Sequence, residues 1–147
     1  MISLDISSII RGRLYLGNKA AAKDLDMLTK LGITHILNAT KEIECHHPKA
    51  FTYLQISIRD GDEHLSDHLE KAIQFIKEGK KVFVHCAKGA SRSASMVIAY
   101  LMRTKNWSYG RGFNLVKKKR PVIKPHFNFK QTLSNFNSRR NRLRNKT

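Results

Sequence analysis

One segment constrains the fold of this chain more than any other. It consists of a short apolar run, a loop and a helical pattern, in that order. Residues 82–84 are β-branched or aromatic and predict a buried strand. Four apolar residues then recur at helical spacing: Ala94, Val97, Ile98 and Leu101. The loop between them leaves the carboxyl end of a strand and enters a helix predicted from Ser91 to about Arg103. Unpaired backbone N–H groups and the helix dipole favour an anion there.

This loop carries a thiol and an arginine with five residues between them. Gly89 lies between Cys86 and Arg92 and lets the backbone wrap closely around a ligand. Arg92 can hold two phosphate oxygens in a bidentate fork. A thiol that faces a helix N-terminus and an arginine ionises readily, so we expect Cys86 to be a thiolate, a nucleophile aimed at phosphorus. The plain alternative is a buried cysteine beside a solvated arginine.

The segment from His85 to Ser93 resembles the signature of cysteine-dependent protein phosphatases, and its Ser-Arg-Ser-Ala ending resembles the dual-specificity branch. Other segments are similar to landmarks of that branch in the same order: residues 14–17, 32–39, 53–56 with Asp60, 98–102, and 120–123 followed by Pro125. The resemblance extends to about Phe136. It implies an α/β fold of the protein tyrosine phosphatase type, with a central, mostly parallel mixed sheet of about five strands flanked by helices.

The resemblance implies that the phosphate is held by one run of loop residues: Ala87, Lys88, Gly89, Ala90, Ser91 and Arg92. A general acid is also needed, because the departing oxygen must receive a proton. Asp60, Asp62 and Glu63 follow the strand predicted at 51–58, and Gly61 lets their loop turn over the phosphate loop. The family's acid aligns with Asp60, and Asp62 is the second candidate.

Three neighbours of the thiol have supporting roles by the same resemblance. The Ser93 hydroxyl would donate to the sulfur, although Ser91 or Ser93 could instead cap the helix. His85 is expected to be a structural, hydrogen-bonding residue whose side chain alternates away from that of Cys86. Asn38 aligns with an asparagine that braces the phosphate loop.

We therefore expect a phosphatase acting on phosphotyrosine and phosphoserine or phosphothreonine in proteins through a phosphocysteine, with no metal or other cofactor. A phosphoinositide or RNA 5′-phosphate phosphatase is the alternative that Lys88 and the net charge of +17 favour. A non-catalytic module that binds phosphoproteins is the alternative of another class, but such a module needs no nucleophile. The physiological substrate and the oligomeric state stay open.

The 147 residues fit one domain, and no run approaches the roughly 18 apolar residues of a membrane helix. The first residues show neither a basic nor an apolar leader pattern, so we expect a cytoplasmic or nuclear protein. Two cysteines argue against a disulfide scaffold. Cys45, followed by His46 and His47, is expected in a surface loop; a metal site and a thiol that traps oxidised Cys86 are the alternatives.

The second half of the chain is strongly basic. Residues 103–147 contain no Asp or Glu, and they carry Arg103, Lys105, Arg111, Lys117, Lys118, Lys119, Arg120, Lys124, Lys130, Arg139, Arg140, Arg142, Arg144 and Lys146. A solvated face with a loose tail is the plain interpretation. The alternative is a docking surface for acidic partners, anionic lipid or RNA. Residues 138–147 either extend the last helix or fray.

The remaining pattern predicts alternating strands and helices. Strands are expected in a hairpin of residues 9–10 and 14–16, at 33–39 and at 51–58. Helices are expected at 25–31 with Gly32 as cap, from a capping box of Asp67 and Glu70 to Gly79, from Ser108 to about Lys119, and from Phe127 to about Asn137 or beyond. Pro125-His126 stands where relatives often have Pro-Asn, which leaves the usual contact before the last helix in doubt.

Overall fold

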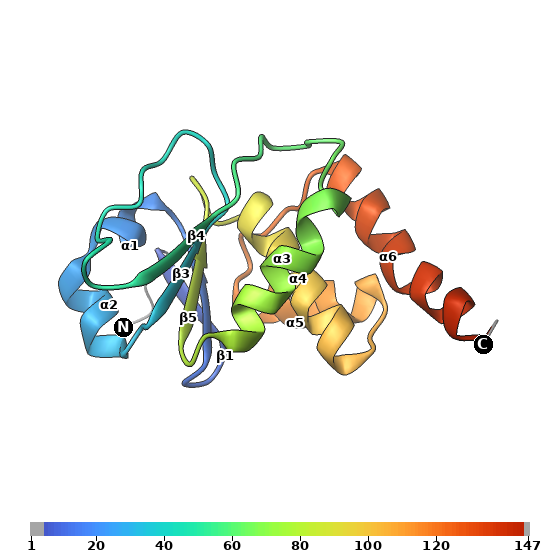
Figure 1. Ribbon diagram of the computed structural model, residues 1–147, viewed down its shortest axis with the longest axis horizontal. Helices are drawn as coiled ribbons and strands as arrows, with labels where there is room; N and C mark the ends of the chain where they lie inside the picture. Colours follow the sequence, from blue (N-terminus) through green and yellow to red (C-terminus); the bar gives the residue numbers. More distant parts are fainter. Residues whose placement is uncertain (1–4, 146–147) are drawn as a thin grey trace.

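The computed structural model describes residues 5–145, with side chains described as far as residue 136. Five strands form one sheet in the order β1-β2-β5-β3-β4 (Figure 1). The strands are β1 (Ile6–Ile10), β2 (Leu14–Gly17), β3 (His35–Asn38), β4 (Thr52–Gln55) and β5 (Val82–His85). Only β1 pairs with its neighbour in the antiparallel sense. The mostly parallel mixed sheet of about five strands is thus confirmed.

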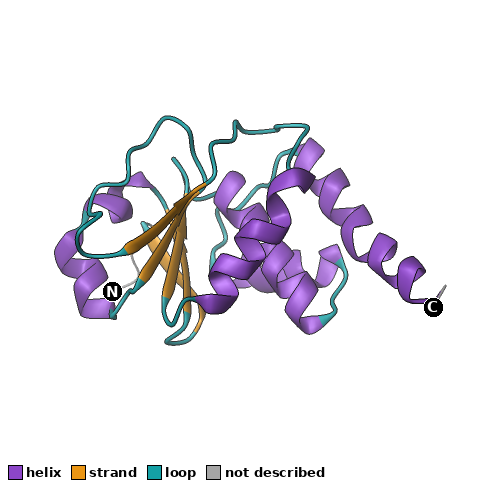
Figure 2. Ribbon diagram, in the orientation of Figure 1, coloured by secondary structure: helices purple, strands orange, loops and turns teal. Residues whose placement is uncertain are grey.

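Helices cover both faces of this sheet (Figure 2). They are α1 (Lys19–Lys23), α2 (Leu25–Leu31), α3 (Ser66–Glu78), α4 (Arg92–Lys105), α5 (Tyr109–Lys119) and α6 (Phe127–Asn145). The pair α1 and α2 packs a small core against one face around Leu28, Ile36 and Phe83. The four longer helices build the larger core on the other face, with α4 buried over most of its length.

Several helix ends follow the expected chemistry. Gly32 ends α2 in the left-handed conformation at φ 79°, and the Ser108 hydroxyl accepts from the backbone N–H of Arg111 at the start of α5. The unusual His126 also acts as a cap, because its Nδ1 accepts from the backbone N–H of Asn128 at 3.0 Å. A histidine nitrogen here satisfies a helix N–H that an asparagine oxygen could accept.

The capping box expected at α3 is wrong. Leu65 is the N-cap and makes no side-chain capping bond, while Asp67 lies inside the first turn. Glu70 reaches α4 instead, where both of its oxygens accept from Arg103 at 2.6 and 2.9 Å. The burial of Leu65, which has 0% of its surface exposed, fixes the start of this helix in place of a polar cap.

Two further local features differ from expectation. Helix α1 was not predicted, because five residues give too short a pattern; Asn18 caps it by accepting from the N–H groups of Ala20 and Ala21. Gly79 ends α3 with extended rather than left-handed backbone. A glycine is required at position 79 because a Cβ there would lie only 2.6 Å from Cγ2 of Val82.

The last helix continues to Asn145, so the backbone of residues 138–145 extends α6. The arginine side chains of that extension lie outside the described residues. Among the described residues, no helix is both long and apolar enough to cross a membrane. The carboxyl ends of the parallel strands lie at one edge of the sheet, where the loops after β3, β4 and β5 meet (Figure 1). In α/β sheets, this edge is the usual ligand site.

Candidate active site at the carboxyl end of the sheet

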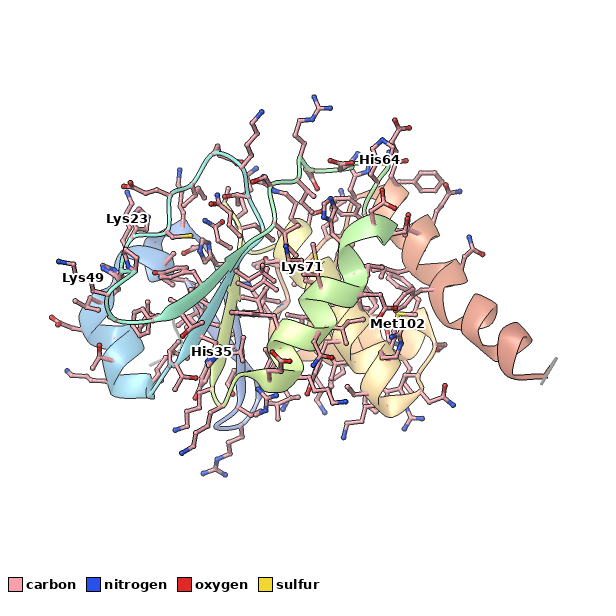
Figure 3. All side chains as sticks on the ribbon, viewed as in Figure 1. Lys23, His35, Lys49, His64, Lys71 and Met102 are labelled. Atoms are coloured by element: carbon pink, nitrogen blue, oxygen red, sulfur yellow. The ribbon has the colours of Figure 1, made fainter. Side chains whose placement is uncertain are left out.

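A cavity of about 430 Å³ opens at this edge. It is lined by Asp60, Cys86, Ala87, Lys88, Ala90, Ser91, Arg92 and Lys124. The residues at 86–92, here called the phosphate loop, connect β5 to α4 as the sequence predicts. Asp60 comes from the loop between β4 and α3, which also carries His64 and runs along the upper edge of the molecule (Figure 3).

The thiol of Cys86 is buried, with 3% of the residue exposed. Its Sγ lies 2.9 Å from Oγ of Ser93, a fully buried residue in the first turn of α4. Ser91 is the N-cap of that helix but makes no side-chain capping bond. The contact places the Ser93 hydroxyl where it can donate to the sulfur.

Arg92 is held by a residue that the sequence did not indicate. Its Nη1 and Nη2 donate to the two carboxylate oxygens of Glu42 at 2.8 and 2.7 Å. Glu42 lies in the loop after β3, fifty positions away in sequence. The hydrogen bonds from Arg92 lower the pKa of the Glu42 carboxyl to about 2, and in return the carboxylate raises the pKa of Arg92. The pair is therefore charged throughout the neutral pH range.

The bonds of Arg92 leave one edge of its guanidinium open. Nη1 also donates to the carbonyl of Ile58 at 3.2 Å, so three of the five N–H groups are engaged. The remaining two, on Nε and Nη2, share one side of the plane and have no partner among the described residues. Two parallel donors match two oxygens of a phosphate. Because Glu42 occupies the Nη1 and Nη2 edge of the guanidinium, the Nε and Nη2 edge remains available to a ligand.

Asp60 is joined to the phosphate loop through Ser91. The Ser91 hydroxyl donates to Asp60 Oδ1 at 2.5 Å and accepts from the backbone N–H of His126 at 2.8 Å. Because His126 occupies the acceptor side of the hydroxyl, the hydroxyl hydrogen is directed at Asp60. This contact holds the carboxyl of Asp60 at the mouth of the cavity.

The second candidate acid is placed differently. Asp62 lines an adjacent hollow rather than the cavity, and its Oδ1 accepts from the backbone N–H of His64 at 2.8 Å. That hydrogen bond lowers the pKa of Asp62, which favours a carboxylate rather than a proton donor. The geometry thus favours Asp60 over Asp62.

His85 supports the loop by packing. It is 1% exposed and stacks on Phe83, with ring centroids 5.5 Å apart. Burial lowers the pKa of His85 to about 4, so the ring is neutral near pH 7. Its Nδ1 is buried without a hydrogen-bond partner within the described part of the chain. A hydrogen bond between His85 and the backbone of Cys86 partly opposes the effect of burial on the pKa of His85.

Asn38 braces a different loop from the one expected. Its Nδ2 donates to the carbonyl of Ile43 at 2.7 Å, and its Oδ1 accepts from both the N–H and the hydroxyl of Thr40. These bonds shape the turn that carries Glu42. Asn38 therefore acts on the site through the partner of Arg92, and its side chain makes no hydrogen bond to the phosphate loop.

Cys45 lies in the same loop as Glu42, half-buried, as a free thiol 3.7 Å from Nδ2 of Asn38. Across residues 5–136 there is no group of three or more His, Cys, Asp or Glu side chains arranged to hold a metal. Part of the predicted basic face is engaged within the protein: Arg103 pairs with the exposed Glu70, and Arg120 is 2% exposed. Lys88 and Lys124 are exposed at the cavity.

Two residues of this site were missed in the sequence. Glu42 was one acidic residue in a polar loop, and Lys124 was one of many basic residues, so neither stood out. The nearest signal for Lys124 is its position one residue before Pro125 in a family landmark. Its backbone N–H donates to the carbonyl of Ala90 at 2.8 Å, which ties the segment before α6 to the phosphate loop.

A buried thiol, an arginine with an open edge and a carboxyl on a neighbouring loop, set on this sheet, define the class of cysteine-dependent phosphatases. The family model described as "Dual specificity phosphatase, catalytic domain" matches residues 14–139. The chain belongs to this family of phosphate-ester hydrolases.

Similar proteins agree with that membership. The chain is 36% identical to protein phosphatase Slingshot of Drosophila melanogaster over 97% of its own length but 14% of the relative's, so it spans a small part of that protein. The crystal structure of human DUSP28 matches with a TM-score of 0.86 and 26% identity over 95% of this chain and 97% of that one. A human tyrosine phosphatase-like serine/threonine/tyrosine-interacting protein matches with a TM-score of 0.84 and 31% identity over 94% and 99%.

Proposed function

We propose that this chain hydrolyses phosphotyrosine and phosphoserine or phosphothreonine esters of proteins through a phosphocysteine intermediate. One observation carries the proposal: Asp60, from the loop after β4, lines the same cavity as Cys86 and Arg92 of the phosphate loop. The names of the relatives support the substrate class, because Slingshot and the Mpk3 protein of Drosophila melanogaster are both named protein phosphatases.

In the first half-reaction the Cys86 thiolate forms a bond to phosphorus while the bond to the leaving oxygen breaks. Asp60 in its protonated form transfers its proton to that oxygen, and Arg92 stabilises the charge on the equatorial oxygens. In the second half-reaction a water molecule gives a proton to the Asp60 carboxylate and its oxygen bonds to phosphorus. The S–P bond breaks, inorganic phosphate leaves, and the Ser93 hydroxyl donates to the departing sulfur.

The test is hydrolysis of matched phosphotyrosine and phosphothreonine peptides, with Cys86→Ser as the control. Wild-type protein should turn over both peptides. The variant should lose turnover yet still bind, because the phosphate loop and Arg92 remain. Substantial activity in Cys86→Ser would contradict the covalent mechanism.

The acid assignment has its own test. Asp60→Asn should lower kcat by about 10²- to 10⁴-fold for substrates with poor leaving groups, and far less for nitrophenyl esters that leave without a proton. Asp62→Asn is the matched control and should stay near wild type, since Asp62 lies outside the cavity. If Asp62→Asn shows the leaving-group dependence instead, the acid is Asp62.

A phosphoinositide or RNA 5′-phosphate activity is the second candidate, favoured by the two exposed lysines at the cavity, Lys88 and Lys124. It predicts a preference for polyanionic substrates and a steep loss of rate with added salt. Activity on a phosphoinositide or a 5′-phosphorylated RNA, with none on peptides, would replace the protein substrate class. Binding without turnover of any of these would indicate a non-catalytic module.

A further inference from the structure

Arg120 is a buried arginine directly behind the phosphate loop, at the end of α5. Its Nε donates to the carbonyl of Gly89 at 2.8 Å, and its Nη2 donates to the carbonyl of Lys88 at 3.3 Å. Its Nη1 donates to the hydroxyl of Ser7 at 3.0 Å. No carboxylate lies within 4 Å of its nitrogens among the described residues. The hydrogen-bond partners of the buried guanidinium are thus two loop carbonyls and the Ser7 hydroxyl, and Asp5 attracts it electrostatically.

These carbonyl contacts fix the direction of the loop's N–H groups. In a trans peptide the C=O and the N–H of the next residue point in opposite directions, and the described chain contains no cis peptide. Because the carbonyls of Lys88 and Gly89 face Arg120, the N–H groups of Gly89 and Ala90 face the other way, toward the cavity that this loop lines. Arg120 therefore sets two of the loop's anion-binding donors.

The neighbouring peptides are held in the same sense by backbone groups. The carbonyl of Ala87 accepts from the N–H of Lys19 at 3.1 Å, and that of Ala90 accepts from Lys124 at 2.8 Å. Four successive carbonyls are thus bonded on the outside of the loop, and the middle two depend on the Arg120 side chain. A nest of N–H groups directed at one point is a general means of binding an oxyanion.

Arg120 carries its charge in a buried position. Burial lowers the pKa of Arg120, and the electrostatic attractions of Cys86 and Asp5 oppose that effect. Arg92 lines the cavity, whereas Arg120 lies on the opposite side of the phosphate loop and does not line it.

We propose that Arg120 is a positioning residue of the phosphatase site, which turns the N–H groups of Gly89 and Ala90 toward the substrate phosphate. The inference rests on the proposed function in taking the phosphate loop as the site that binds the substrate phosphate. It assigns Arg120 no contact with substrate, so it differs in kind from the role of Arg92.

The test separates orientation from charge. Arg120→Lys keeps a cation but loses the planar fork, and Arg120→Met loses both. Affinity for tungstate, a phosphate-shaped dianion, should fall about tenfold in both variants. The backbone amide resonances of Gly89 and Ala90 should shift when tungstate is added to the wild-type protein, and far less in both variants.

Arg13→Met is the matched control. Arg13 lies in the turn between β1 and β2 and also donates to a backbone carbonyl, that of Ile76 in α3, at 2.7 Å. This variant should leave the tungstate affinity and the amide shifts unchanged. Folding is checked by thermal unfolding, and if Arg120→Met does not fold, Arg120→Lys decides. A folded Arg120→Lys variant with wild-type tungstate affinity and wild-type amide shifts would overturn the inference.

Neither measurement needs turnover. If wild-type protein hydrolyses no phosphopeptide, the proposed function fails, while tungstate affinity and the amide shifts still report on Arg120. If wild type is active and the Arg120 variants bind tungstate and show amide shifts as wild type does, the inference alone fails.

Discussion

Arg92 makes its two shortest side-chain contacts with a carboxylate fifty positions earlier in the chain. A side chain that must offer two parallel donors to a phosphate gains from having its other donors occupied, because its plane is then fixed before the ligand arrives. The Arg92 side chain is 10% exposed and that of Glu42 is 55% exposed, so water screens the pair on one side. We expect the pair to matter more for geometry than for stability.

Glu42→Gln should lower kcat/KM by about tenfold, since the amide can accept one bond from Arg92 but cannot form the charged fork. The free energy of unfolding should change little. Glu44→Gln is the matched control, because Glu44 lies in the same loop and contacts His46 rather than Arg92. Equal kinetics for Glu42→Gln and wild type would show that Arg92 is positioned without its carboxylate partner.

At the scale of elements, the site depends on how the loop after β4 meets the segment before α6. Gly61 has φ 79°, and a Cβ on it would lie 2.5 Å from Nε2 of His126. Asn128 Nδ2 donates to the carbonyl of Gly61 at 2.9 Å. The loop that carries Asp60 is therefore pressed onto the start of α6, and its position depends on the absence of a side chain at Gly61.

Gly61→Ala should lower the free energy of unfolding by roughly 2 to 4 kcal/mol, because it combines a left-handed backbone with a collision. It should also lower kcat by displacing Asp60. Gly12→Ala is the control: Gly12 has φ 69° but nothing within 4 Å of a Cβ, so only a cost of about 1 kcal/mol is expected. Urea unfolding measures the free energy of unfolding, and peptide hydrolysis measures kcat. Equal losses of stability in the two variants would show that the collision with His126 does not destabilise the protein.

At the scale of the whole molecule, the buried histidine links stability to pH. The pKa of His85 is about 4 in the folded protein, below its ordinary value of 6.5. Above pH 6.5 the ring is neutral in both states and has no effect. Between pH 6.5 and 4 the unfolded chain binds a proton at His85 that the folded protein does not bind, so stability falls as the pH falls.

The loss attributable to His85 should reach about 3 kcal/mol by pH 4, from the 1.36 kcal/mol that accompanies each pH unit. Chemical unfolding at a series of pH values measures it. In His85→Gln the decline over this window should be shallower by that amount. His64→Gln is the control, because the His64 side chain is 69% exposed, and it should keep the wild-type slope. A wild-type slope in His85→Gln would mean that residue 85 does not titrate differently in the two states.

Errors in the sequence-based prediction of elements have local causes. Asp67 and Glu70 have the spacing of a capping box, yet Glu70 is better satisfied by Arg103 of α4. The strand expected at 51–58 ends at Gln55, because the N–H of Ile58 donates to the carbonyl of Ile56 at 3.0 Å rather than to the sheet. A residue pattern shows which groups need partners but does not show which partners are near.

Most helices and strands, in their order along the chain, and the Cys86-to-Arg92 loop could be predicted from the sequence by itself, because these depend on periodicity and spacing within short segments. The resemblance to the family indicated Asp60 as the candidate acid. Only the tertiary structure decided that Glu42 orients Arg92, that Asn38 shapes the Glu42 turn, and that Arg120 lies behind the phosphate loop. Glu42 and Arg120 are fifty and about thirty residues from the atoms they bind. Such pairings arise from strand order and helix packing, which bring distant loops to one edge of the sheet.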